Sequence, residues 1–500
     1  MNKMKFFPSL AIFVIIATSV SCSKKDESEP IPAPVLKTFA FLAANNAGVL
    51  SEDYQGTIEG TAVTVTMPST IDKSSLIATF TTNEGDVVTI GSAVQTTDVT
   101  ANDFSVPVDY SLANSDASLN SLYTVTIAKK TDMNWTASAA YVGTSTVYSG
   151  AIMKINPKDN SPLLAFKVRA DSVVTGNVGK MTLLRFSNNS WEKVGNEAFS
   201  AQISGSEMDL DIMEDGTPYV AFENAEATVN KCASVMSYNG SAWNYVGDAA
   251  ISSDMASTKV HFAVISANDI ILAQVNNKAG SFARRIMVMS SYKGNAWSNA
   301  ENPAMTSGFQ VYDEKIAKVG DCAYLAIISR DAGYACTVLK YQGDKWTSLL
   351  DNYTTANSTG NSIAALDLVA LEDGTLFLLT ADDAVTTGSY QLRLQKYSPS
   401  TNAWTTVGGN PLSYIIESHN YARVAIAPDG TPYVAYQNYA NKQIEICHID
   451  SDTKQWSSPT IISPLVGNSC SGLSICFAGT GTGFLGYIDG DSHYQLYQYK

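Results

Sequence analysis

The 500-residue sequence has few of the residues on which catalytic and metal sites depend. It holds four histidines and seven cysteines, and charged residues make up only 16% of the chain. The histidines lie far apart, and no His/Cys cluster has the spacing of zinc ligands. The sequence contains neither a Gly-x-Ser-x-Gly elbow nor a glycine-rich phosphate loop. We therefore assign no catalytic residue, no metal ligand and no cofactor.

Basic residues are also scarce. The chain has 32 Lys and Arg against 47 Asp and Glu, which gives a net charge of −15. A protein that tracks nucleic-acid phosphates needs a basic face, so we expect no nucleic-acid partner. Hydrophobic residues make up 45% and aromatic residues 10% of the chain, and this composition excludes general disorder.

No apolar run is long enough to span a bilayer comfortably; the longest one, FFPSLAIFVIIA, covers residues 6–17. It follows two lysines and leads through small residues to Cys22, which is the layout of a secretory signal. Residues 1–21 resemble a bacterial lipoprotein signal peptide, with Cys22 as the acylated first residue of the mature chain. The alternative is an ordinary cleaved signal peptide with an incidental cysteine.

The sequence after Cys22 carries a second resemblance. The charged residues 23–27 (SKKDE) resemble the export tag of surface lipoproteins of the Bacteroidetes. This resemblance implies an outer-membrane protein that faces the cell exterior and is held to the membrane by its lipid alone. Residues 22–35, polar and rich in proline, are predicted to form a linker.

Residues 36–130 contain no Trp and no Cys, and apolar residues alternate there with period two. The alternating segments are TAVTVTM, LIATFTT, DVVTI, VPVDYSL and LYTVTIA. Short strands at this density predict an immunoglobulin-like (Ig-like) β-sandwich. The segment also resembles the Ig-like modules that precede larger domains in Bacteroidetes surface lipoproteins. We interpret it as a spacer, with an accessory binding module as the alternative.

All seven tryptophans lie in residues 131–500, at spacings of 56, 52, 54, 49, 58 and 52 residues. Such a period indicates an internal repeat. An aromatic residue stands five positions before four of them, and a turn followed by an apolar strand stands roughly 25 positions before most of them. The clearest copies of this strand are DGTPYVAF, DGTLFLLT and DGTPYVAY, beginning at Asp215, Asp373 and Asp429. We interpret these aspartates as turn formers; a cation-binding rim is the alternative.

Each unit holds four strands without helical periodicity, which predicts a β-propeller. The last unit ends at residues 493–500 without a Trp, whereas residues 134–135 supply a Trp strand without a predecessor. We therefore predict an all-β chain in which an Ig-like sandwich precedes a seven-bladed propeller closed by pairing of its N-terminal and C-terminal strands. The Tyr/Phe-x(4)-Trp turns with Val-Gly after several tryptophans resemble kelch-like bacterial propellers, although the double glycine of true kelch repeats is missing.

Six cysteines follow Cys22, an even number that permits disulfides in an exported chain. Cys322 and Cys336 lie on either side of a predicted hairpin turn, and we expect that they could face each other. Otherwise the cysteines are small core residues.

Propellers usually bind ligands through the loops between their second and third strands and between blades. Here these loops combine polar and aromatic residues, which can hydrogen-bond sugar hydroxyls and stack on a sugar ring. The candidate ligand-binding residues are Arg169, Glu223, Arg285, Arg330, Asp382, His419 and Arg423.

The sequence thus favours a monomeric, cell-surface, non-catalytic protein that binds a glycan or a surface protein. The first alternative is a glycoside hydrolase or lyase with carboxylates in the central pocket of the propeller. The second is a structural scaffold with exposed apolar patches.

Overall fold

The computed structural model of the chain contains β-strands and no helix in the part that it describes, and none of that part could cross a membrane as an apolar helix. The described residues are 32–141, 147–168, 178–226, 231–252, 254–278, 283–301, 310–331, 333–353, 363–383, 390–408, 412–416, 422–438, 441–463 and 471–500.

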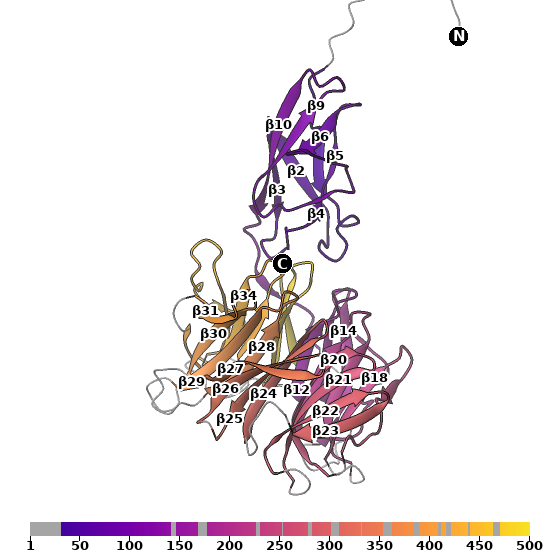
Figure 1. Ribbon diagram of the computed structural model, residues 1–500, viewed down its shortest axis with the longest axis vertical. Helices are drawn as coiled ribbons and strands as arrows, with labels where there is room; N and C mark the ends of the chain where they lie inside the picture. The colour runs from indigo at the N-terminus through magenta and orange to yellow at the C-terminus, as the bar shows by residue number, and fades with distance from the viewer. Residues whose placement is uncertain are drawn as a thin grey trace, which may run out of the picture.

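The first ten strands form a separate N-terminal unit (Figure 1). They are β1 (Thr38–Phe41), β2 (Tyr54–Glu59), β3 (Ala62–Met67), β4 (Leu76–Ile77), β5 (Thr79–Thr81), β6 (Val87–Ile90), β7 (Ala93–Val94), β8 (Ala101–Asn102), β9 (Val108–Ala113) and β10 (Asn120–Lys129). Eight of them pair in the order β5-β1-β2-β3-β10-β9-β6-β7, and β4 pairs with β8.

Alternation with period two places one face of each strand in a shared core, as the sequence predicted. In β3, for example, Val63, Val65 and Met67 are buried and the residues between them are exposed. The Ig-like arrangement of two packed sheets is not confirmed. The first residues of β2, Tyr54 and Gln55, pair with β1, and its remaining residues pair with β3. The strands therefore form one continuous sheet around the core.

The remaining strands form seven blades of a β-propeller. Blade 1 consists of β12 (Val147–Ile155), β13 (Pro162–Val168), β14 (Val178–Ser187) and β15 (Ser190–Lys193). Blade 2 consists of β16 (Ile203–Ile212), β17 (Pro218–Asn224), β18 (Ala233–Tyr238) and β19 (Trp243–Tyr245). Blade 3 consists of β20 (Ser257–Ser266), β21 (Asp269–Asn276), β22 (Met287–Lys293) and β23 (Ala296–Glu301). Blade 4 consists of β24 (Val311–Val319), β25 (Cys322–Ser329), β26 (Ala335–Gln342) and β27 (Lys345–Tyr353).

Blades 5 to 7 complete the ring. Blade 5 consists of β28 (Ile363–Ala370), β29 (Leu376–Asp383), β30 (Tyr390–Ser398) and β31 (Ala403–Thr406), with β32 (Leu412–Ile416) also paired to β30. Blade 6 consists of β33 (Ala422–Ile426), β34 (Pro432–Gln437), β35 (Ile444–His448) and β36 (Thr460–Ile461). Blade 7 consists of β37 (Ser471–Phe477), β38 (Gly483–Ile488), β39 (Tyr494–Tyr499) and β11 (Trp135–Ala137).

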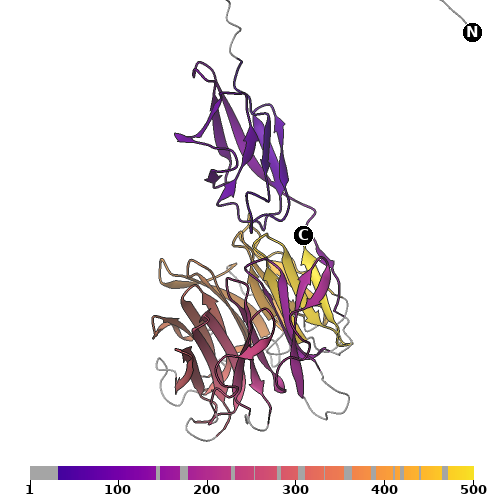
Figure 2. The same ribbon diagram turned by 90° about the vertical axis from the view of Figure 1, so that its right-hand side faces the viewer.

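Blade 7 confirms the predicted closure, because its outer strand comes from the beginning of the propeller sequence. Trp135 pairs with Tyr499, and Ala137 pairs with Tyr497. The Ser138 amide extends the ladder by donating to the Leu496 carbonyl at 2.8 Å. In Figure 2 the C-terminal strands lie beside the first propeller strands, so that both ends of the ring meet in one blade.

The tryptophans link neighbouring blades, which explains their period. The indole Nε1–H of Trp243 donates to the Val194 carbonyl of the preceding blade at 3.1 Å, and that of Trp297 donates to the Val246 carbonyl at 2.7 Å. The glycine after each valine has a positive φ, and a Cβ on Gly247 would lie 2.8 Å from the Trp297 ring. Val-Gly therefore forms a socket for the tryptophan of the next blade.

The propeller has two unlike faces. We call the face with the turns between first and second strands the turn face, and the opposite one the loop face. The N-terminal unit lies on the turn face (Figures 1 and 2). There Thr70 Oγ1 donates to the Gly481 carbonyl at 2.8 Å, the Asp429 amide donates to the Thr70 carbonyl, and Asn160 Nδ2 donates to the Gly48 carbonyl. The loop face points away from the N-terminal unit.

The structure corrects the expected contact between Cys322 and Cys336. Cys322 begins β25 at the turn face, whereas Cys336 pairs with Ile328 at the loop-face end of the same hairpin. Six residues of extended strand separate the two positions, about 20 Å at 3.3 Å per residue. Both side chains are buried, so they are core residues.

Candidate functional site

The recurrent Asp-Gly turns are structural. The Asp215 carboxylate accepts the Thr217 amide at 2.9 Å, and this bond and the Thr217 hydroxyl lower the pKa of Asp215. Asp373 and Asp429 accept the amides of Thr375 and Thr431 in the same way. Among the described residues no group of three or more His, Cys, Asp or Glu side chains is placed to hold a metal ion.

The predicted binding residues divide into three groups in the structure. Arg330 and Arg285 lie on the loop face, where Arg330 directly follows the second strand β25 and Arg285 precedes the third strand β22. Glu223 is buried between blades, and Arg423 lines the axial channel. Arg169, His419 and the lipidation residue Cys22 lie outside the described residues, as does the side chain of Asp382, whose backbone belongs to β29.

Arg330 belongs to a group of side chains that we call the loop-face cluster: Tyr312, Arg330 and Tyr334. The guanidinium carbon of Arg330 lies 5.2 Å from the centre of the Tyr312 ring, a cation–π contact. The Tyr312 and Tyr334 rings meet edge to face, with centroids 5.0 Å apart. All three side chains are half-buried, and burial raises the pKa of the Tyr312 phenol. The cluster therefore combines aromatic surface with a charged hydrogen-bond donor.

Backbone hydrogen bonds fix this cluster to two blades. The Val311 amide donates to the Arg285 carbonyl of blade 3 at 2.9 Å, and the Arg330 amide donates to the Gln310 carbonyl at 2.8 Å. Asp331 holds the same segment, because its carboxylate accepts the Gln310 amide at 2.8 Å. The structure thus brings Arg285 and Arg330 together around residues 310–312, which the sequence alone did not predict.

Glu223 does not form part of the loop-face surface. It is 6% exposed in β17, and Lys167, at the equivalent position of β13, is fully buried. Burial lowers the pKa of Lys167 to about 8, and the negative charge of Glu223 opposes that shift. Since a buried charge needs a partner, we assign Glu223 a structural role between blades 1 and 2.

The inner strands of the blades enclose an axial channel with a cavity of about 400 Å³. Its charged lining residues are Lys154, Asp209, Asp211, His261, Lys315, Lys318, Asp367 and Arg423. The channel opens toward the turn face at a second cavity of about 450 Å³, which shares Lys318 with the first.

The three aspartates of the channel bond to the backbone. Asp209 accepts the Phe262 amide, Asp211 the Val264 amide and Asp367 the Val424 amide, at 3.2, 2.8 and 2.9 Å. Each acceptor oxygen thus satisfies an N–H of the inner strand of the next blade. The other oxygen of each carboxylate accepts the amide of its own following residue. These carboxylates link adjacent blades by hydrogen bonds. The bonds stabilise the fold, because leaving a buried backbone amide without an acceptor costs free energy.

A buried relay supports Lys315 at the channel wall. Lys315 Nζ lies 2.9 Å from His261 Nε2, and His261 Nδ1 lies 2.9 Å from Glu314 Oε1. Glu314 is fully buried, and burial raises its pKa to about 8. Burial therefore favours the protonated, uncharged form of Glu314.

Sequence reasoning missed Lys154, Lys315 and His261. The sequence pattern alone does not distinguish a charged residue on an inner strand from a charged residue in a solvated loop. One signal was available for Arg423, which lies six residues before Asp429. Asp209 and Asp367 hold the same position before Asp215 and Asp373. This register places all three on the inner strand, at the channel wall.

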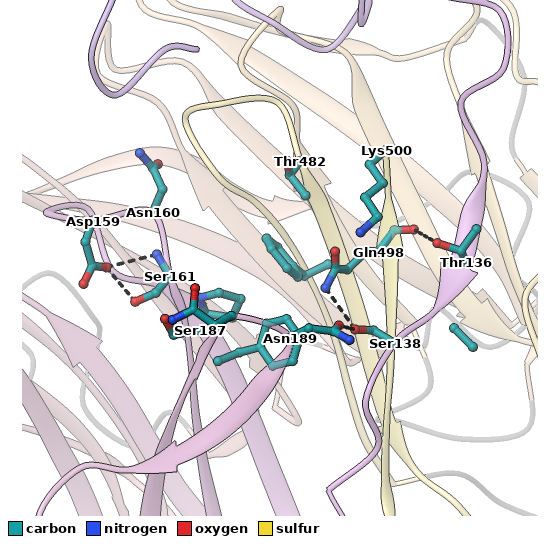
Figure 3. A pocket seen from close by; sticks show the side chains of 15 residues that line it. Thr136, Ser138, Asp159, Asn160, Ser161, Ser187, Asn189, Thr482, Gln498 and Lys500 are labelled. Atoms are coloured by element: carbon teal, nitrogen blue, oxygen red, sulfur yellow. Dashed lines mark hydrogen bonds between the residues drawn. The ribbon is translucent and has the colours of Figure 1, made fainter. Parts of the chain in front are cut away.

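The closure of the ring leaves a separate cavity of about 610 Å³, which we call the latch pocket (Figure 3). Gln498 Nε2 donates to Ser138 Oγ at 3.0 Å, and Ser138 Oγ donates to Asn189 Oδ1 at 2.8 Å. Asn160, which bonds to the N-terminal unit, lines the same pocket. The latch pocket therefore lies at the turn face, beside the N-terminal unit.

Fold and site together define an all-β protein with a seven-bladed propeller whose loop face points away from the N-terminal unit. Residues 47–127 match the family model described as "SGBP, N-terminal", the N-terminal part of surface glycan-binding proteins. The match covers most of the N-terminal sheet. No curated protein matches the sequence.

Several solved propeller structures are similar to the chain. AofleA from Arthrobotrys oligospora has 10% identity and a TM-score of 0.42, covering 66% of this chain and 90% of its own. The fucose-binding lectin of Aleuria aurantia, with six blades, has 15% identity and a TM-score of 0.38, covering 56% and 86%. The α-L-arabinofuranosidase Arb93A of Fusarium graminearum has 9% identity and a TM-score of 0.43, covering 74% and 98%.

Proposed function

We propose that this protein is a cell-surface lipoprotein that binds a glycan without cleaving it, through the loop face of its propeller. Cys22 is the lipid attachment site, residues 1–21 are the signal peptide, and residues 22–35 link the lipid to the folded chain. Residues 36–130 act as a spacer, Ig-like in kind, and residues 131–500 form the binding propeller, kelch-like in its repeats. The chain acts as a monomer in the outer membrane.

The observation that carries this proposal is the loop-face cluster of Tyr312, Arg330 and Tyr334. Protein sites for sugars combine an aromatic ring that stacks on the sugar with donors that bond its hydroxyls. The match of residues 47–127 to a glycan-binding family supports the same class of ligand. Because the N-terminal unit lies on the turn face, an anchor at its end leaves the loop face pointing away from the membrane.

The hydrogen bonds of the channel carboxylates favour binding of a glycan over its hydrolysis. A glycosidase needs two carboxyl groups that face the scissile bond, one of them as an acid. Both oxygens of Asp209, Asp211 and Asp367 accept backbone amides, so these groups act on the fold. A glycoside hydrolase or lyase remains the alternative.

A protein ligand or a scaffold role receives less support from the propeller surface. Among the described residues nine large hydrophobic side chains are exposed, and seven of them belong to residues 35–122. The two on the propeller, Tyr245 and Ile461, lie on outer strands. No exposed apolar patch of the kind that a scaffold needs therefore covers the described part of the loop face.

Affinity gel electrophoresis against plant and microbial polysaccharides tests the proposal. The wild type should be retarded by at least one of them, and Tyr312→Ala should weaken the binding about tenfold, or ~1.4 kcal/mol. Tyr245→Ala, which removes an exposed tyrosine from an outer strand, is the matched control and should bind like the wild type. Unchanged retardation of a folded Tyr312→Ala variant, or release of reducing ends from the polysaccharide, would contradict the proposal.

A further inference from the structure

The axial channel collects positive charge in a chain that is negative overall. Lys154, Lys315, Lys318 and Arg423 line it together with three aspartates, whereas the whole sequence has a net charge of −15. The aspartates are bonded to the backbone of the channel wall. Lys154 Nζ lies 3.8 Å from Asp209 Oδ1, and Lys318 Nζ lies 3.3 Å from Asp211 Oδ2, so both lysines form ion pairs. Arg423 and Lys315 therefore remain as the cations whose charge faces the cavity.

Arg423 occupies a position on the inner strand of blade 6 that is an aspartate in blades 2 and 5. Asp209 and Asp367, at the same place on their inner strands, use both carboxylate oxygens to bond backbone amides. An arginine cannot accept these bonds, because its guanidinium has only donors. Among the described residues the Arg423 side chain makes one hydrogen bond, from Nη1 to the Ala422 carbonyl at 2.8 Å, and no ion pair. Its other guanidinium donors bond none of the described residues, and the side chain lines the channel cavity.

Lys315 is held at the wall by a hydrogen bond to an imidazole nitrogen, which accepts because an ammonium group can only donate. Within the described residues it forms no ion pair with a carboxylate; its Nζ contacts His261 Nε2 instead. The His261 ring is oriented in turn by the buried Glu314. This relay orients the ammonium, and the charge of Lys315 also lowers the pKa of the buried Asp313 carboxyl. Half-buried cations interact more strongly with an anion than cations in water do.

We propose that the channel is a binding site for an anionic group of a sugar, a uronate carboxylate or a sulfate ester, held by Arg423 and Lys315. The inference rests on the proposed glycan-binding function and specifies its ligand class. The guanidinium of Arg423 offers the paired donors that fit a carboxylate or sulfate. Lys315 supplies a second charge from blade 4, and the cavity of about 400 Å³ lies within the size range of small-molecule sites.

Calorimetric titration of the full mature chain at low ionic strength tests the inference. The probes are galacturonate, glucuronate, galactose 6-sulfate and, as the neutral control, galactose. Either the two uronates or the sulfate should bind, galactose should bind at least tenfold more weakly, and added salt should weaken binding of the anion. The arm that binds identifies the anionic group. Failure of every anion to bind the wild type, or equal binding of galactose, would overturn the inference.

Variants show where the anion binds. Arg423→Gln should weaken binding at least tenfold, and Lys315→Gln several-fold, while Lys345→Gln, which removes an exposed lysine from outer strand β27, should have no effect. Thermal melting of each variant shows whether it is folded, and Arg423→Lys provides a milder second variant that keeps the charge but loses the paired donors. Anion binding that is unchanged in folded Arg423→Gln would overturn the inference.

The two proposals fail in different ways. If Arg423→Gln retains full retardation by the polysaccharide and the wild type binds no anion, the channel proposal is wrong and the loop-face proposal stands. If Tyr312→Ala retains retardation while Arg423→Gln loses it, the channel is the site and the loop-face proposal is wrong.

Discussion

At the scale of single residues, an indole packs on a glycine of the preceding blade at three junctions of the described structure. The Trp297 N–H donates to the Val246 carbonyl, and Gly247 with φ of +74° leaves room for the ring. A hydrogen bond of this kind contributes about 1 kcal/mol, and the stacked ring adds buried apolar area. The same socket at Gly195 and Gly408 explains why Val-Gly recurs in the sequence.

Gly247→Ala should destabilise the protein more than Gly240→Ala does. Both glycines have a positive φ, but a Cβ at Gly247 would lie 2.8 Å from Trp297, whereas nothing lies within 4 Å of one at Gly240. The difference should be about 1–3 kcal/mol, the cost of overpacking. Denaturant unfolding of the two variants measures it, and equal losses would count against the socket.

Glu314 should make stability depend on pH. Its pKa is raised to about 8 by burial, above its unfolded value near 4.3. The folded state therefore binds more protons than the unfolded state between these values, so this group lowers stability as the pH rises from about 5 to 8.

Glu314→Gln removes that titration while keeping an acceptor for His261. Its stability relative to the wild type should therefore increase between pH 5 and pH 8, as measured by denaturant unfolding at both values. A stability difference that is independent of pH, or one that falls, would show that Glu314 does not titrate in this range.

At the scale of elements, the sequence predicted the architecture because the same pattern of strands and tryptophans recurs in each blade, and each copy supports the interpretation of the others. The spacing of the tryptophans defined the number of blades, and the ends of the chain predicted the shared blade, which the pairing of Trp135 with Tyr499 confirms. The topology of the N-terminal unit was less predictable, because alternation with period two shows which face is buried but not which strands pair.

The candidate site was harder to predict than the fold. Arg330 lies on the loop face, directly after β25. Glu223 and Arg423 differ from solvated loop residues only through the register of their strands, which the sequence does not show directly. Glu223 is buried and Arg423 lines the channel. The cysteines were hard to place for the same reason. Cys322 and Cys336 lie on two adjacent strands, β25 and β26, but at opposite ends of the hairpin that these strands form.

The latch strand β11 should control the stability of the whole ring. Deletion of residues 131–140, or Ser138→Pro, which removes the amide that donates to Leu496, should lower the melting temperature and leave a single cooperative transition. Thr131→Pro, before the strand begins, is the control. Differential scanning calorimetry would contradict the prediction if the latch variants melted like the wild type, or if only a local transition changed.

At the scale of the whole molecule, the N-terminal unit and the loop face lie at opposite ends. Contacts of Thr70 with Gly481 and Asp429 seat the N-terminal unit on the turn face. The latch pocket lies on that same side, next to Asn160. A chain anchored at its N-terminus therefore presents the loop-face cluster outward and keeps the latch pocket toward the anchor.

Hydrogen exchange of the protein with and without a polysaccharide that retards it tests the central claim most directly. Binding at the loop face should slow exchange in residues 310–316 and 333–338, and leave the turn-face residues 156–162, 213–218 and 478–484 unchanged. Protection confined to the turn-face segments, or protection shared equally by both faces, would contradict the account.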